Sequence, residues 1–195
     1  PAAAPVQSGV QGGFDFGAVA ERHYVTILTS AQLDEWLAKL DAAEIAAVDT
    51  ETTSLDPLQA KIVGISFSVA ANEAAYLPMA HRAPGAPQQL DFDATLAKLK
   101  PWLENPAKLK LGQNLKYDQH VFANHGIALA GIAHDTLLQS YVLESHKTHN
   151  MDDLAQRHLG VTTISYEQVC GKGAKQIGFD EVDVQTATDY SAEDA

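Results

Sequence analysis

The chain has 195 residues, 46% of them apolar, and a formal net charge of −12 from 13 basic and 25 acidic side chains. This length suits one globular domain with a short tail, and the single cysteine, Cys170, excludes an intramolecular disulfide framework and favours a reducing, cytoplasmic location. No stretch reaches the ~18 consecutive apolar residues of a membrane span, and the first 20 residues lack the Lys or Arg of a signal peptide.

Residues 1–21 are rich in Ala, Pro and Gly, which predicts a linker or disordered arm before a domain that spans 22–195. Short β-branched or apolar runs predict strands, and apolar residues at helical spacing predict helices. Ser30 and Asn114 are expected to cap two of the helices. In chain order, strands are expected at 24–28, 45–51, 61–69, 74–80 and 108–111, and helices at 30–40, 92–103, 114–126, 136–145, 151–159 and 180–194.

Three of the expected strands follow one another closely, which predicts an antiparallel meander, and the later strands are expected to be parallel. The simplest packing is an α/β fold in which a mixed sheet of about five strands has helices on both faces. The chain begins at Pro1 rather than Met and carries no helix stop signal after Asp194. We therefore expect it to be a fragment of a longer protein.

Asp49 and Glu51 stand two residues apart at the end of an apolar run. Because side chains alternate along a strand, both carboxylates leave the same face of the sheet and can share a cation. The carboxyl ends of buried strands are also where α/β sheets bind ligands. By itself, an acidic pair at a strand end is equally typical of a solvated surface.

Two further pairs have helical spacing. Asn114 and Asp118 lie four residues apart at the start of a predicted helix, where an acid also complements the helix dipole. Tyr190 and Asp194 lie four apart near the end of the chain, about 6 Å along a helix axis, so the phenol and the carboxylate point the same way. Each pair alone is compatible with an ordinary surface.

In this order, Asp49-x-Glu51, Asn114-x-x-x-Asp118 and Tyr190-x-x-x-Asp194 resemble the three motifs of the DEDDy 3′→5′ exonucleases. The wider sequence is similar to the proofreading domain of bacterial DNA polymerase I, the Klenow type of family A, over about residues 22–195. This resemblance implies a ribonuclease H-like fold. The segments that carry it are VDTETTSLD (48–56), VGISFSV (63–69), LGQNLKYD (111–118), HDTLLQSYVL (134–143), MDDLA (151–155) and DYSAEDA (189–195).

The resemblance also implies an activity, the removal of mismatched nucleotides from a DNA primer 3′ end as 5′-mononucleotides. It implies that Asp49, Glu51 and Asp194 bind a first divalent ion and that Asp49 bridges to a second ion near Asp118. Two such ions stabilise both the entering and the departing oxygen of a phosphodiester displacement. Four carboxylates suit Mg²⁺ or Mn²⁺, and Zn²⁺ is compatible with the first site.

Tyr190 has a reference phenol pKa near 10 and is too weak a base to take a proton from water, so it is expected to orient the water, assisted by Glu51. The resemblance places Thr52 and Leu55 against the terminal nucleotide, with Leu55 as an apolar wedge. Stacking on an aromatic side chain accepts any base, as a proofreading enzyme without sequence preference requires. Stacking is expected from Tyr166, and strand-backbone contacts from Gln113, Asn114 and Tyr117; simple packing is the alternative for Leu55 and Tyr166.

The loop after Leu143 departs from the family pattern, because Thr148 stands where the family has an arginine. A phosphate contact there is therefore in question, unless His146, Lys147 or His149 substitutes. A metal site made by His146 and His149 is the alternative to a solvated polar loop, which we favour. Lys172 and Lys175 are either strand contacts or surface charges, and no catalytic role is expected for Cys170.

The expected partners are a single-stranded or frayed DNA 3′ end and a polymerase domain in the same parent chain, with a monomeric, nucleoid-associated enzyme that does not engage membranes. The net negative charge weighs against non-specific nucleic-acid binding, unless the acids hold cations or an adjacent domain supplies a basic surface. Two other functions stay open. One is a non-catalytic scaffold that positions a polymerase or DNA, and the other is a DEDDy exoribonuclease with the same acids.

Overall fold

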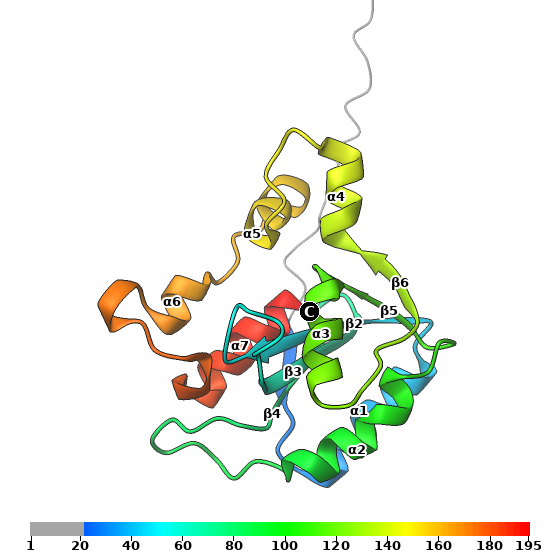
Figure 1. The fold of residues 1–195 in the computed structure, drawn as a ribbon, viewed down its shortest axis with the longest axis vertical. Helices are drawn as coiled ribbons and strands as arrows, with labels where there is room; N and C mark the ends of the chain where they lie inside the picture. The colour runs from blue at the N-terminus through cyan, green and yellow to red at the C-terminus, as the bar shows by residue number, and fades with distance from the viewer. Residues whose placement is uncertain (1–21) are drawn as a thin grey trace, which may run out of the picture.

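The computed structural model describes residues 22–195, so the linker expected at 1–21 lies outside the described residues. Its centre is a six-stranded mixed sheet in the order β1-β4-β3-β2-β5-β6 (Figure 1). This confirms the expected α/β sheet and adds one strand, β6, whose four residues IAHD carry no period that marks a strand. The strands are β1 (His23–Thr26), β2 (Ile45–Thr52), β3 (Ile62–Ala70), β4 (Glu73–Pro78), β5 (Leu109–Gly112) and β6 (Ile132–Asp135).

The pairing of the strands confirms the expected topology. Strands β2, β3 and β4 pair antiparallel as a meander. Strand β5 then joins β2 in parallel, and β6 joins β5 in parallel. The first strand, β1, adds to the far edge of the meander by pairing in parallel with β4. The sheet thus places β2 between the meander and the parallel strands.

Helices cover both faces of the sheet, and α4, α5 and α6 form an arm that leaves the sheet at β6 and returns to it at α7 (Figure 1). No helix within residues 22–195 is long and apolar enough to cross a membrane. The α-helices are α1 (Ser30–Ala42), α2 (Phe92–Leu103), α3 (Leu115–Asn124), α4 (Thr136–Glu144), α5 (Met151–Leu154), α6 (Tyr166–Cys170) and α7 (Val184–Asp194).

Three parts of the predicted helices need correction. The helix expected at 151–159 is one α-helical turn followed by a π-helix at Ala155–Leu159. Between the last two predicted helices the structure has a further helix, α6, which was not predicted, and a short 3₁₀ turn at Gly173–Lys175. The last helix begins at Val184, because Asp183 caps it after a separate 3₁₀ turn at Phe179–Glu181.

Both expected helix caps are wrong in detail. Thr29, rather than Ser30, caps α1, and it forms a reciprocal capping box with Gln32. Asn114 precedes α3 in the left-handed conformation, with φ of 62°, and its side chain makes no capping hydrogen bond. Instead the carboxylate of Asp135, distant in sequence, accepts from the backbone N–H groups of Asn114 and Leu115 at 3.2 and 2.9 Å.

Two hydrophobic clusters fix the layers. The larger one packs α1, α2 and α3 onto one face of the sheet, with Trp36, Phe67 and Trp102 among its buried side chains. The smaller one packs α6 and α7 onto the opposite face, around Tyr76 and Phe179. The sheet is therefore covered on both sides. Successive side chains of β2 point to opposite faces, so they pack against different helices.

Lys110 on β5 is fully buried and closes the end of α2. Its ammonium donates to the carbonyls of Trp102 and Asn105 at 2.7 and 3.1 Å, and it lies over the Trp102 ring at 4.5 Å. The last carbonyls of a helix lack partners within the helix and carry its negative dipole end, which attracts a cation. Burial, and then the charge of Lys108, lowers the pKa of Lys110 to about 8.

We expect Lys110→Met to lower the free energy of unfolding by about 1 to 3 kcal/mol, because two buried carbonyls lose their donor. A lysine pKa that is lower in the folded state than in the unfolded chain makes stability rise as pH increases through about 8. The variant should lack this gain. Urea unfolding of both proteins at pH 7 and pH 9.5 measures the two effects, and identical pH dependences would contradict the assignment.

Candidate active site

Strand β2 runs past the end of its parallel neighbour. The β2–β5 register covers only Ile45–Ala47 of β2, so the rest of the strand has β3 alone as a partner. Gly112 ends β5 at this point, and a Cβ there would lie 2.7 Å from the carbonyl oxygen of Val48. Glycine therefore lets the chain turn away closely beside β2. The overhanging end of β2 leaves an open edge where groups from other elements can bind.

Asp49 and Glu51 lie in this overhang and point to the face that α7 covers. Their register partners on β3 are Ser66 and Gly64, and directly opposed residues of antiparallel strands share a face. The Oγ of Ser191 on α7 donates to Oε1 of Glu51 at 2.8 Å in a buried hydrogen bond. Helix α7 is thereby fixed to the strand through one of the predicted acids.

Asp118 approaches from α3, on the other face of the sheet. Its Oδ1 accepts two hydrogen bonds from Thr50, at 3.1 Å from the backbone N–H and at 2.6 Å from Oγ1. The open edge of β2 supplies the backbone donor, since β5 has already ended. Asp118 is 2% exposed. Thr50, which lies between Asp49 and Glu51 on β2, therefore fixes the α3 carboxylate beside the two strand carboxylates.

Tyr190 and Asp194 lie one turn apart on α7, as their spacing predicted. Burial, and then the charges of Asp194 and Glu51, raises the pKa of Tyr190 far above its usual range. The phenol therefore keeps its proton at neutral pH and can only donate it as a hydrogen bond. This property agrees with an orienting role and excludes a basic one.

All eleven predicted site residues line a single groove of about 1240 Å³. The floor contains the acids, and the walls come from the segment after β2, from the start of α3, from the loop between α4 and α5, and from the segment before α7. Segments far apart in sequence therefore meet at this groove. The predicted residues that line it are Asp49, Glu51, Thr52, Leu55, Gln113, Asn114, Tyr117, Asp118, Tyr166, Tyr190 and Asp194.

The four carboxylates are costly to ionise together. Burial raises the pKa of Asp49 to about 6. Burial, and then the charge of Asp49, raises the pKa of both Asp118 and Asp194 to about 8. The pKa of Glu51 lies well above its usual range for the same two reasons. Within residues 22–195, no Lys, Arg or His forms an ion pair with any of the four acids.

The donor set of the groove fits hard divalent cations, which prefer carboxylate oxygens. As the described side chains stand, no three acidic, histidine or cysteine residues already form a metal cage. An ion held by Asp49, Glu51, Asp118 and Asp194 would therefore require these side chains to move closer together.

The predicted strand contacts are ordered in part by one another. Thr52 Oγ1 lies 2.5 Å from Tyr117 Oη, which donates to the carbonyl of Ser54 at 2.5 Å. Leu55 is 94% exposed, which excludes core packing as its role. Tyr166 stacks on Phe179 with ring centroids 6.5 Å apart and keeps part of its surface exposed to the groove.

The loop between α4 and α5 forms the opposite wall. Gln113 Nε2 donates to the carbonyl of His149 at 2.8 Å, which joins this wall to a predicted strand contact. The His149 ring packs on Tyr141 at 3.8 Å and shares a 2.7 Å hydrogen bond with Ser140, so it is a buried packing residue. Nothing within 22–195 makes His149 and His146 a metal site. Lys147 lines the groove beside them.

Sequence reasoning missed the residues that hold the acids in place, Thr50 and Ser191. Thr50 lies between two predicted acids, and Ser191 follows Tyr190, so both are adjacent to motif residues. Their hydrogen bonds join positions 68 and 140 residues apart in sequence. No local period carries such information.

A family model described as 3′-5′ exonuclease matches residues 24–195. DNA polymerase I of Pseudomonas aeruginosa is 52% identical over 192 residues, which are 97% of this chain and 21% of that protein. DNA polymerase I of Rhizobium leguminosarum is 37% identical over an alignment 226 residues long, which covers 100% of this chain and 22% of that protein. The chain thus spans about a fifth of the length of these relatives.

Solved structures show the same fold at low identity. The Aedes aegypti Nibbler EXO domain has a TM-score of 0.63 at 14% identity, covering 92% of this chain and 86% of that one. Brucella melitensis NrnC has a TM-score of 0.59 at 19% identity, covering 91% and 76%. These likenesses confirm the ribonuclease H-like architecture. Because the family model spans nearly all of the described residues and the groove contains every acid of the three motifs, the chain belongs to the 3′-5′ exonuclease family.

Proposed function

We propose that this chain is the proofreading exonuclease domain of a DNA polymerase, which removes nucleotides one at a time from a DNA 3′ end as 5′-monophosphates. The observation that supports this most is the convergence of four carboxylates and Tyr190 in one groove with exposed apolar and aromatic side chains. A non-catalytic scaffold would gain nothing from four clustered carboxylates whose ionisation opposes folding. The similarity to DNA polymerase I favours DNA over RNA as the substrate.

Asp49, Glu51, Asp118 and Asp194 would hold two divalent ions, Mg²⁺ or Mn²⁺, with Zn²⁺ compatible with the first site. When bound, such ions supply Lewis-acid stabilisation of the charge that develops on the phosphodiester oxygens. Tyr190 donates a hydrogen bond and so orients the attacking water, and Glu51, which is held against α7 by Ser191, assists it. The chain's own contribution is therefore to position water and strand.

The walls of the groove select an unpaired strand end. Leu55 projects from the end of β2 and acts as a wedge against the last base, and Tyr166 offers a stacking face supported by Phe179. Gln113, Asn114 and Tyr117 contact the strand backbone. A mismatched end melts more cheaply than a paired one, so a groove that admits only unpaired nucleotides removes errors without recognising the wrong base. The substrate end is delivered by a polymerase domain of the same parent chain.

Replacing the metal-binding acids should abolish cleavage without unfolding the domain. We expect no detectable degradation of a 5′-labelled oligodeoxynucleotide in Mn²⁺ by Asp49→Ala or Asp118→Ala. Tyr190→Phe loses one oriented hydrogen bond and should slow cleavage by about 10- to 100-fold. Asp93→Ala, an exposed acid on α2, is the matched control with full activity. If Asp49→Ala cleaved at the wild-type rate, the proposed binding of two divalent ions by these acids would be excluded.

Divalent ions should stabilise the fold because they neutralise the buried acids. We expect Mn²⁺ to raise the melting temperature of the wild type above its value in EDTA. In EDTA at pH 8, Asp118→Asn should be more stable than the wild type by about 2 to 4 °C, because one repelling charge is lost while the Thr50 hydrogen bonds keep an oxygen acceptor. Thermal unfolding followed by circular dichroism measures both shifts. No response to Mn²⁺ in the wild type would count against ion binding at these acids.

Degradation rates on DNA and RNA strands of the same sequence test which nucleic acid is the substrate. We expect single-stranded DNA and duplex DNA with a mismatched 3′ end to be degraded faster than a fully paired duplex, and DNA faster than RNA of the same sequence. Time courses on 5′-labelled strands give the four rates. Faster degradation of the RNA strand would instead support the exoribonuclease alternative.

A further inference from the structure

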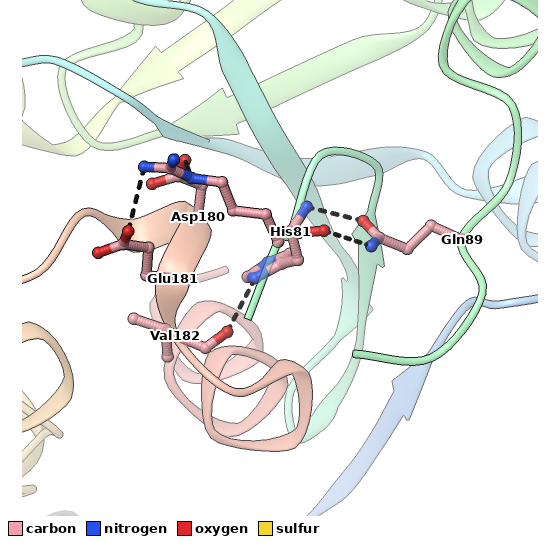
Figure 2. Close-up of polar contacts among 6 residues, drawn as sticks. His81, Gln89, Asp180, Glu181 and Val182 are labelled. Carbon is pink, nitrogen blue, oxygen red and sulfur yellow. Dashed lines mark hydrogen bonds and ion pairs between the residues drawn. The ribbon is translucent and has the colours of Figure 1, made fainter. Parts of the chain in front are cut away.

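A hydrogen-bonded cluster around His81 joins the segment after β4 to the segment before α7 (Figure 2). His81 is 7% exposed, and its Nδ1 lies 3.0 Å from the carbonyl oxygen of Val182 while its Nε2 lies 2.7 Å from Tyr76 Oη. A carbonyl can only accept, so Nδ1 carries the proton. In the neutral ring, Nε2 then accepts from the Tyr76 phenol. The two contacts together fix one tautomer and one ring orientation.

The backbone around His81 is held as firmly as the ring. Gln89 accepts from the N–H of His81 and donates to its carbonyl, both at 2.8 Å, as Figure 2 shows. The N–H of Arg82 donates to the carbonyl of Asp180 at 2.7 Å. The Arg82 guanidinium pairs with the side chains of Asp180 and Glu181 (Figure 2). Residues 81–82 thus contact three successive residues, 180–182.

Those three residues lead directly into α7. Asp183 follows Val182 and caps the helix by accepting from the N–H groups of Gln185 and Thr186 at 3.0 and 3.1 Å. Tyr190 and Asp194 lie farther along the same helix. The position of Val182 therefore sets where α7 begins, and a helix transmits that position to the side chains along it.

The other end of the cluster reaches the strand that carries Glu51. The Tyr76 ring packs over Gly64, where an added Cβ would lie 2.1 Å from Tyr76 Oη. Gly64 is the register partner of Glu51, and Tyr76 lies across from Ser66, the partner of Asp49. The contacts from Tyr76 through His81 to Val182 consequently join the face of the sheet that carries Asp49 and Glu51 to the helix that carries Asp194 and Tyr190.

We propose that His81 is a positioning residue for the exonuclease reaction, which sets the register of α7 against β2 through Tyr76 and the Val182 carbonyl. This inference rests on the proposed function. His81 does not touch the groove, so it acts through the placement of Tyr190 and Asp194. A displacement of about 1 Å in a reacting group can cost 10²-fold in rate. Five of the proposed strand contacts, Thr52, Leu55, Gln113, Asn114 and Tyr117, lie away from α7 and from the segment that His81 holds. The sixth, Tyr166, packs on Phe179, which lies beside His81.

The first test is a kinetic separation in Mn²⁺ with a 5′-labelled oligodeoxynucleotide. We expect His81→Ala to lower kcat by at least about tenfold and to leave KM within twofold of the wild type. His81→Asn, whose amide can donate near the former Nδ1, should recover part of the loss. Tyr76→Phe should also lower kcat, and adding it to His81→Ala should cost little more, because both act through one chain of contacts.

Lys110→Met is the matched control, because it removes a buried polar contact at the end of α2, away from the groove. Assays of all variants at the same interval below their own melting temperatures remove the contribution of general destabilisation. The proposal is supported if His81→Ala loses kcat and Lys110→Met does not. It is overturned if the two variants lose kcat equally, or if His81→Ala keeps the wild-type value.

A readout that needs no cleavage separates this proposal from the proposed function. Hydrogen exchange of the α7 amides should accelerate in His81→Ala relative to wild type and to Lys110→Met, and ¹⁵N spectra of the wild type should show His81 protonated at Nδ1. If the wild type degrades no nucleic acid, the proposed function fails, while faster α7 exchange still supports the positional role. Unchanged α7 exchange in His81→Ala overturns the inference, whatever the activity.

Discussion

The central physical constraint in this molecule is the gathering of four carboxylates, two buried and two half-buried, in one groove with no ion-pair partner among the described residues. Burial raises the pKa of all four acids, and the charge of Asp49 raises it further for Glu51, Asp118 and Asp194, so their common ionisation opposes folding. A protein keeps such an arrangement when a ligand of opposite charge compensates for it. Under the proposed function, the same feature would reconcile a net charge of −12 with a polyanionic substrate, because cations held by these acids would reverse the local charge.

Two of the four acids, Asp118 and Glu51, accept hydrogen bonds from residues on other elements. Strand β2 extends beyond the end of β5, so the backbone N–H of Thr50 is free to donate to Asp118, as does the Thr50 hydroxyl. Ser191 donates to Glu51 and so fixes α7 against the strand. Behind them, His81 joins the two parts of the structure that carry the acids on this face. The groove is thus a meeting point of a strand end and two helices from opposite faces.

Family membership and geometry together account for the character of the groove. The match to the 3′-5′ exonuclease family covers β2, α3 and α7, which are the elements that hold the four acids. The groove continues from the acids to exposed side chains such as Leu55 and to Tyr166. An extended polymer end can therefore lie across the walls while its last linkage reaches the floor.

Much of the site was determined by the sequence itself, because strand and helix periods are local. Alternation along β2 places Asp49 and Glu51 on one face, and a separation of four residues on a helix aligns Tyr190 with Asp194. The meander and most helices follow from the same periods. The tertiary structure alone decided the sixth strand, the cap that Asp135 supplies to α3, and the hydrogen bonds that hold the acids. Each of these depends on partners distant in the chain, which meet only when the sheet and its crossovers have formed, and no local pattern encodes such a meeting.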